Sequence, residues 1–290
     1  MNSVLIVSIL LNGIVLGLVY AAVALGFSLV LGVSGVINFC HGVMFAFGAY
    51  FFWLLKDVIG FWPSVVVVPV LVAAIGFLIE RLLIRRVYGL DPLFGLLITL
   101  GFSIALEELI RMIFGPAAHN VSAPSFANGC IIIGDFIYSE YRIFIGIFAA
   151  VMLGSTWLLI SKTKFGAIVK AGMFNSEMIG ALGHNLPKLR TTVFILGTAL
   201  AGLSGILAAP IWSIKSGMGA AVLMPSFLIV LMGGLGSIPG TIVAGLLVGV
   251  TSALATLVCP RFVDIIPYVL LGVVIYFWPR GFFGEQNIAD

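Results

Sequence analysis

Long apolar stretches separated by short polar segments dominate the chain. No Asp, Glu, Lys or Arg occurs in residues 1–55 or in residues 216–260. A membrane-spanning helix needs about 20 apolar residues, so each of these stretches has room for two spans. Shorter apolar segments between charged residues predict further spans, at 61–79, 93–114, 143–161, 191–214 and 265–279.

The spacing of these segments predicts a polytopic membrane protein. At roughly 20 residues for each helix, the chain accommodates about eight to nine transmembrane helices and leaves no room for a domain outside the membrane. We therefore expect an all-α helix bundle that forms a single transmembrane domain over residues 1–290. The first apolar run lacks a basic n-region and a small-residue cleavage site, so we interpret it as a span and not as a signal peptide.

Composition supports this fold class. Hydrophobic residues make up 62% of the chain and charged residues only 9%, whereas a soluble domain has about 25% charged residues. A soluble chain of this composition would have too little polar surface to face water. The cysteines are Cys40, Cys130 and Cys259, with no spacing typical of a metal site, so we expect no metal and interpret Cys40 as a packing residue.

Basic residues gather in two segments and define the sides of the membrane. Residues 80–91 carry three Arg, and residues 161–190 carry five Lys or Arg against one Glu. The positive-inside rule places both segments in the cytoplasm. The segment 115–142, with few charges, then lies outside. This arrangement predicts an external N-terminus and a cytoplasmic C-terminus.

Each of the two long charge-free runs contains a polar, glycine-rich interruption. These are "GVINFCHG" at 35–42 and "GGLGSIPG" at 233–240. Paired interruptions of hydrophobic segments are typical of an inverted repeat of broken or re-entrant helices with a transport path between its halves. The candidate residues of a path wall or gate are Asn38, His41, Gly42, Ser237 and Pro239. In the alternative interpretation, Asn38 and His41 only hydrogen-bond the backbone of a turn.

The cytoplasmic segment 161–190 contains a predicted short helix. Asn175 or Ser176 can cap its N-terminus, and Gly183 suits the position just after its C-terminus. Pro187 suits the first turn of the next helix. A helix of about seven residues is not stable alone, so it must dock on its own bundle or on a soluble partner. The candidate coupling residues are Glu177, Met178, Ile179, Leu182 and Gly183.

A charged cluster lies near the outer end of the predicted span 93–114. Glu107 and Arg111 are four residues apart, and Glu108 and Arg111 are three apart, so both pairs lie on one helix face. Charged residues within a span are candidates for function. The alternative is a structural ion pair at the membrane interface.

Motifs for catalysis and nucleotide binding are absent from the sequence. It has no HExxH motif, no Ser-His-Asp set and no P-loop, so it is not expected to hydrolyse ATP. Energy for active transport would have to come from a partner, an ion or a binding reaction.

Six segments in order resemble the signatures of one transporter family. They are "YAAVALGFSLVLGVSGVINFCHGVMFAFGAY" (20–50), "ITLGFSIALEELIRMIFGP" (98–116), "KTKFGAIVKA" (162–171), "GTALAGLSGILAAP" (197–210), "LMGGLGSIPGTIVAGLLVGV" (231–250) and "WPRGFFG" (278–284). Together they resemble the LivH-type permeases of branched-chain amino-acid ABC importers. The resemblance covers nearly the whole chain.

This resemblance implies a multi-pass inner-membrane subunit with several partners. They are a LivM-like second permease, two LivG/LivF-like ATPases that bind ATP and Mg, and a periplasmic substrate-binding protein. The segment 161–190 corresponds to the part of the permease that contacts the ATPases, with Glu177 and Gly183 at its acidic and glycine positions. The chain itself is expected to carry no cofactor and to bind no nucleic acid.

Departures from the family pattern leave the substrate open. Cys40 stands where Ala is usual, and Val43 stands where an acidic residue is frequent. Related systems carry urea, short amides or aromatic acids, so these substrates remain alternatives to branched-chain and other neutral amino acids. An ion-coupled carrier is a rival of another class. It would need a buried coupling site, for which only His41 and Glu107 or Glu108 are available.

Overall fold

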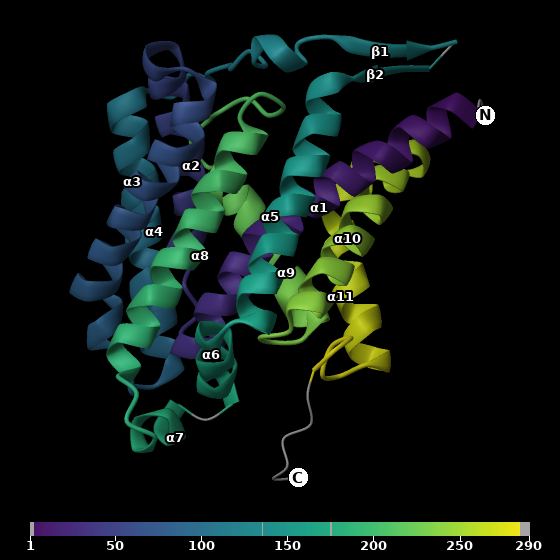
Figure 1. Ribbon diagram of the computed structural model, residues 1–290. Helices are drawn as coiled ribbons and strands as arrows, with labels where there is room; N and C mark the ends of the chain where they lie inside the picture. Colours follow the sequence, from purple (N-terminus) through teal and green to yellow (C-terminus); the bar gives the residue numbers. More distant parts are fainter. Residues whose placement is uncertain (1–2, 135, 175, 285–290) are drawn as a thin grey trace.

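The computed structural model describes residues 3–134, 136–174 and 176–284 (Figure 1). Its longer helices are α1 Ser3–Ser34, α2 Cys40–Ile59, α3 Phe61–Leu82, α4 Pro92–Phe114, α5 Glu140–Lys162, α8 Leu186–Ala208, α9 Met218–Gly233 and α10 Ile238–Val258. The remaining elements are α6 Lys164–Phe174, α7 Ser176–Ala181, α11 Ile266–Phe277, the 3-10 helices η1 Ile84–Arg86, η2 Ser125–Ala127 and η3 Pro260–Ile265, and strands β1 Cys130–Ile133 and β2 Phe136–Ser139.

The predicted polytopic helix bundle is confirmed. Within the described ranges, 8 helices are long and apolar enough to cross a membrane, and the eighth combines η3 with α11. The helix α9, with 16 residues, is shorter than these spans. The inverted repeat stays a prediction.

Helix α1 forms the centre of the bundle and packs on α5, α8, α9 and α10. Its closest approach is to α10, through glycines on both helices. A Cβ atom on Gly17 would lie 2.8 Å from the carbonyl oxygen of Gly245, and one on Gly13 would lie 2.8 Å from Val250 Cα. Small residues at such a crossing let two helix backbones come together inside a membrane, where dispersion forces do most of the stabilising.

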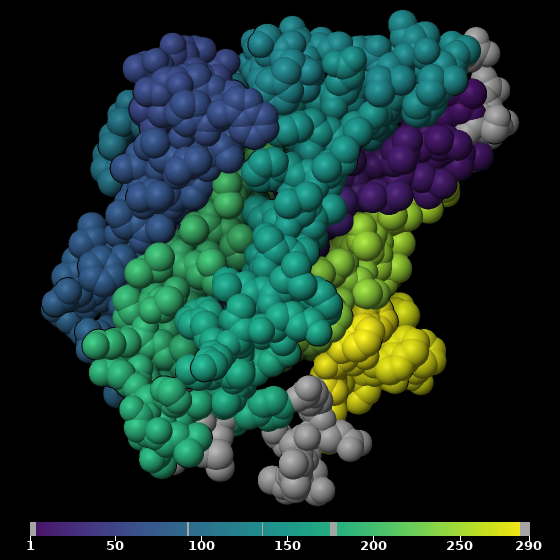
Figure 2. All heavy atoms as spheres, in the orientation of Figure 1, coloured from purple at the N-terminus to yellow at the C-terminus, as the bar shows by residue number. Residues whose placement is uncertain are grey.

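The two ends of the bundle differ in charge and structure. The hairpin β1–β2 and the start of α1 lie at one end, whereas α6, α7 and the end of α11 lie at the other (Figure 1). The second end carries the segments predicted to be cytoplasmic, so the orientation with this end inside stays a prediction of the positive-inside rule. In the space-filling view, the segment that contains the hairpin covers the outer edge from α3 to α1 (Figure 2).

One predicted span was wrong at both ends. The helix expected at 191–214 is α8, which starts at Leu186 because the Asn185 side chain accepts a hydrogen bond from the backbone N–H of Lys188 at 3.0 Å. It finishes at Ala208. Further on, Ile214 pairs with His119 of the outer segment in an antiparallel bridge. The charges of Lys188 and Arg190 fall in the first turns of this helix and do not separate it from a loop.

Candidate translocation path and coupling surface

The first polar interruption lies between α1 and α2 and is shorter than its sequence suggests. Gly35, with φ at 69°, follows the last turn of α1. His41 and Gly42 were predicted within the break but belong to the first turn of α2. The reason is that Asn38 Oδ1 accepts a hydrogen bond from Cys40 N at 3.1 Å, which supports the start of the helix at Cys40.

A threonine from α4 holds this break in place. The Thr99 hydroxyl donates to the carbonyl oxygen of Ile37 at 2.9 Å and accepts from Phe39 N at 3.2 Å. The carbonyl of Thr99 also accepts from Cys40 Sγ at 3.3 Å. Irregular backbone at membrane depth is tolerated only where protein or water satisfies it. The sequence interpretation missed Thr99, although its hydroxyl within an apolar span was a visible signal.

His41 and Gly42 connect α2 to two other helices. His41 Nε2 lies 3.1 Å from the carbonyl oxygen of Val23, which has its regular place in α1. The imidazole also meets the Phe27 ring edge-on at 5.5 Å between centroids. On the neighbouring face, a Cβ on Gly42 would lie 2.8 Å from Leu223 Cβ of α9. This turn is therefore a packed junction of α1, α2 and α9.

Two polar atoms at this junction lack a protein partner among the described residues. They are Asn38 Nδ2 and His41 Nδ1, and both side chains are no more than 1% exposed. In the alternative role, these residues only hydrogen-bond the backbone. Such bonds involve Asn38 Oδ1 and His41 Nε2, which is one polar side-chain atom of each residue. The remaining atoms are costly to bury unless water or a solute binds them. A role of this junction in a transport path stays a prediction.

The second interruption joins α9 to α10. Gly234 and Gly236 have positive φ values of 92° and 79°. The Ser237 side chain then accepts from Gly240 N at 3.2 Å and caps α10, with Pro239 in its first turn. Pro239 is exposed and Ser237 is half-buried. These two residues therefore begin a helix at the cytoplasmic end of the bundle.

The C-terminal segment closes this second break. The backbone N–H of Phe282 donates to Met232 O at 2.8 Å, and that of Phe283 donates to Gly233 O at 3.2 Å. These bonds satisfy carbonyls at the end of α9 that have no partner within the helix. The break is therefore held by protein on this side.

The predicted cytoplasmic helix is α7, and its predicted stop signal is confirmed. Gly183 has φ at 83°, and its N–H donates to Gly180 O at 3.0 Å, while His184 N donates to Ile179 O at 3.1 Å. These two bonds form a Schellman motif. Pro187 lies in the first turn of α8, as predicted. Of the two candidate caps, Ser176 is the first residue of α7, and Asn175 lies outside the described residues.

The candidate coupling residues divide between the bundle and the surface. Ile179 is 2% exposed and packs with Val169 and Leu189, so it holds α7 on its own bundle and does not face a partner as expected. Leu182 is 67% exposed and points away from this core. The side chains of Glu177 and Met178 lie outside the described residues, although both belong to α7.

A methionine of α6 lies close to the end of α1 and to the second interruption. A Cβ on Gly32, near the end of α1, would lie 3.2 Å from Met173 Sδ, and one on Gly236, in the second break, would lie 3.1 Å from the same sulfur. The Met173 side chain therefore lies between the end of α1 and the second break, and it belongs to the segment 161–190. From the sequence, Met173 could be placed in the segment 161–190, but its contacts depend on tertiary packing and could not be predicted.

The charged cluster of α4 is arranged differently from its prediction. Glu108 and Arg111 form an exposed ion pair at 3.4 Å. Glu107 instead accepts a hydrogen bond from Ala220 N at 3.1 Å, at the start of α9. A carboxylate at this position suits the positive end of a helix. The predicted three-residue ion cluster thus reduces to a pair, and Glu107 anchors α9.

A buried carboxylate that the sequence interpretation missed links α3 to α8. Glu80 is 1% exposed and accepts hydrogen bonds from Thr191 Oγ1 at 3.0 Å and from the Tyr88 hydroxyl at 3.3 Å. Burial, together with the negative charge of Glu80, raises the pKa of Tyr88 well above its usual value. The Arg190 guanidinium lies over the Tyr88 ring at 4.6 Å. This network fixes the cytoplasmic start of α8 beside the coupling segment.

Comparison with protein families gives one match over most of the chain. Residues 9–278 match the family described as the branched-chain amino acid transport system / permease component. No solved structure matches the chain significantly.

Individual relatives are similar over nearly their full lengths. The high-affinity branched-chain amino acid transport system permease protein LivH of Escherichia coli (strain K12) is 30% identical over 96% of this chain and 95% of its own. The corresponding protein BraD of Pseudomonas aeruginosa is 29% identical over 96% of both chains. The permease protein LivM of E. coli is more distant, at 25% identity over 82% of this chain and 62% of its own.

Proposed function

The chain belongs to the family of branched-chain amino acid transport system permease components, and from this membership we propose that it is the LivH-type permease subunit of an ATP-driven importer of branched-chain or other neutral amino acids. It is a multi-pass protein of the bacterial inner membrane. Its own residues are expected to guide the solute and to transmit motion, with no catalytic step.

The family match carries this proposal, and the position of Met173 in α6 supports its coupling part. The Met173 side chain lies close to Gly32 near the end of α1 and to Gly236 in the second break. A displacement of α6 would therefore reach the end of α1 and the second break at once. Such small shifts of packed elements are a common way to convert a binding event into a switch between two states.

The partners follow from the names of the relatives and from the family resemblance. A LivM-like permease would complete the membrane part, and the similarity of this chain to both LivH and LivM supports two related permeases. Two LivG/LivF-like subunits would bind ATP and Mg below α7, where Leu182 is exposed. A periplasmic binding protein would deliver the amino acid to the face that carries β1 and β2.

The proposal is tested by uptake in proteoliposomes that contain the whole complex. We expect leucine uptake to require internal ATP and external binding protein, and to persist when the proton and sodium gradients are collapsed. Glu177→Lys and Gly183→Pro are expected to abolish uptake without loss of membrane insertion. Uptake that follows an ion gradient and not ATP would instead indicate a secondary carrier.

The substrate is tested separately. Urea, acetamide and an aromatic acid are offered to the same proteoliposomes in place of leucine. Since the binding protein selects the solute, its affinity for each compound is measured in parallel. Uptake of one of these compounds, together with no uptake of leucine or another neutral amino acid, would keep the importer and replace its substrate.

A further inference from the structure

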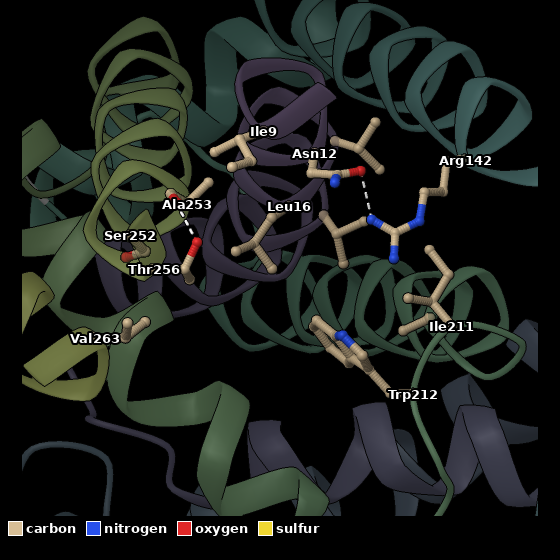
Figure 3. Close-up of a pocket in the computed structure, with 13 residues that line it drawn as sticks. Ile9, Asn12, Leu16, Arg142, Ile211, Trp212, Ser252, Ala253, Thr256 and Val263 are labelled. Atoms are coloured by element: carbon tan, nitrogen blue, oxygen red, sulfur yellow. Dashed lines mark hydrogen bonds between the residues drawn. The ribbon is translucent and has the colours of Figure 1, made fainter. Parts of the chain in front are cut away.

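We infer that a cavity on the outer side of the bundle receives a solute that has one carboxylate and an aliphatic body. The cavity has a volume of about 250 Å³ and lies between the outer parts of α1, α8 and α10 and the start of α5 (Figure 3). The inference rests on the proposed function, because it assigns to the imported amino acid a site on the face where it is delivered.

The polar end of this cavity consists of Asn12 and Arg142. The Arg142 guanidinium donates a hydrogen bond to Asn12 Oδ1 and points into the cavity (Figure 3). Within the part of the chain that the structure describes, the ion pairs are Lys56–Asp57 and Arg111–Glu108, so Arg142 has no carboxylate partner there. A guanidinium has five N–H donors, and most of those of Arg142 therefore remain available.

The positive charge of Arg142 favours an anionic ligand. Its side chain is half-buried and lines the cavity, where its positive charge attracts an anionic group. The planar guanidinium can bind both oxygens of a carboxylate, and the Asn12 amide nitrogen provides a further donor beside it. Urea and simple amides would leave the charge of Arg142 uncompensated, so they do not fit this site.

The rest of the cavity is mostly apolar, with the hydroxyl residues Ser252 and Thr256 of α10 in its lining. Its walls include Ile9, Leu16, Ile211 and Val263, with Trp212 on one side (Figure 3). At ~30 Å³ for each molecule, the cavity would hold about eight waters, which suits a free aliphatic amino acid and is too small for a phospholipid with its acyl chains. An aliphatic side chain would therefore contact these walls while its carboxylate binds Arg142.

The residues that line the cavity lie near the predicted outer end of the bundle. Arg142 lies in the first turn of α5, directly after the outer hairpin. Ile211 and Trp212 follow the outer end of α8, and the nearby Ile214 pairs with His119 of the outer segment. The solute would thus meet this site before it reaches the junction at Asn38 and His41.

The test is equilibrium binding of radiolabelled leucine to the whole permease–ATPase complex in nanodiscs, without binding protein. We expect 4-methylpentanoate, which keeps the carboxylate and the chain, to compete with leucine, and leucinamide, which lacks the carboxylate, not to compete. Arg142→Gln should weaken leucine binding at least tenfold, and Asn12→Ala should weaken it less. Arg261→Gln is the matched control, because Arg261 is exposed on the same outer side and does not line the cavity.

Several results would overturn the inference. They are an absence of leucine binding to the wild-type complex, unchanged binding in folded Arg142→Gln, and equal competition by leucinamide and 4-methylpentanoate. A loss of co-purifying phospholipid in Arg142→Gln, with leucine binding unchanged, would assign the cavity to lipid instead. Failure of ATP-driven leucine uptake by the wild-type complex would contradict the proposed function. The binding measurement does not depend on transport, so it would still test whether the cavity binds a carboxylate.

Discussion

The side chain of Met173 packs against the backbone of Gly236, so that a Cβ at Gly236 would come within 3.1 Å of the Met173 sulfur. The same sulfur packs on Gly32 of α1. One flexible side chain of the segment 161–190 thus packs near both the end of α1 and the second interruption. Because methionine adapts to irregular gaps, this contact can persist while the helices shift.

Met173→Ala should uncouple the cytoplasmic helices from the membrane path. Truncation removes the contact with both Gly32 and Gly236, and loss of a partly buried methionine costs about 2 kcal/mol. We expect the ratio of leucine imported to ATP hydrolysed to fall several-fold in proteoliposomes. Met224→Ala is the control, because Met224 of α9 is exposed at its surface, and an unchanged ratio in Met173→Ala would contradict the role of this contact.

The fold class and the helix stops could be predicted from the sequence because they depend on local properties. Apolar runs of sufficient length predicted the spans, and the left-handed conformation of Gly183 followed from its place after a short helix. The helix start near Pro187 was predicted, but the membrane span was placed too late, at 191, because the capping Asn185 outweighs the charges of Lys188 and Arg190. The apolar run predicted that the short helix α9 exists, but it did not predict where this helix begins and ends.

The candidate site was predictable only in part. The two interruptions were recognised from glycine and polar residues, yet His41 lies in a helix, since Asn38 supports the start of that helix at Cys40. Thr99, Met173 and Glu80 act through partners far away in the sequence, and no local pattern reports such contacts. The pairing of Glu107 with the start of α9 depends in the same way on the packing of two helices.

Thr99→Val should destabilise the first interruption. The substitution keeps the volume but leaves Ile37 O and Phe39 N without the Thr99 hydroxyl. Each unsatisfied buried backbone group costs about 1–3 kcal/mol. We expect a lower thermal midpoint for the detergent-solubilised complex and reduced uptake, whereas Thr99→Ser, which retains the hydroxyl, should behave nearly as wild type. Equal midpoints for the two variants would show that the hydroxyl is not needed.

Gly42→Ala should disrupt the contact between α2 and α9. An added Cβ would meet Leu223 Cβ at 2.8 Å, and the carbonyl oxygen of Gly219 lies closer still, at 2.5 Å. Overpacking of this kind costs about 1–3 kcal/mol. Gly101→Ala is the matched control, because Gly101 is helical and nothing lies within 4 Å of its added Cβ. Thermal unfolding should separate the two variants, and similar midpoints would contradict the close packing.

Glu107→Ala should weaken the start of α9, whereas Glu108→Ala should have little effect. Glu107 accepts from Ala220 N at the first turn of α9, and loss of such a cap costs about 1 kcal/mol. Glu108 belongs to an exposed ion pair with Arg111, worth at most about 1 kcal/mol and often much less. Hydrogen exchange of residues 218–222, measured by mass spectrometry, should increase only in Glu107→Ala. An increase in exchange in Glu108→Ala and not in Glu107→Ala would contradict the role of Glu107 at the start of α9 and would favour the ion pair as the important feature.

Gly183→Ala should loosen the coupling helix without unfolding the bundle. Gly183 has φ at 83°, a conformation that costs alanine about 1 kcal/mol, so the Schellman bonds to Gly180 and Ile179 should weaken. Gly180→Ala is the control, because Gly180 is helical and its added Cβ would meet nothing within 4 Å. We expect slower ATP-driven uptake for Gly183→Ala and normal or slightly faster uptake for Gly180→Ala, with equal thermal midpoints. Identical uptake in the two variants would mean that the geometry of the α7 stop does not contribute to coupling.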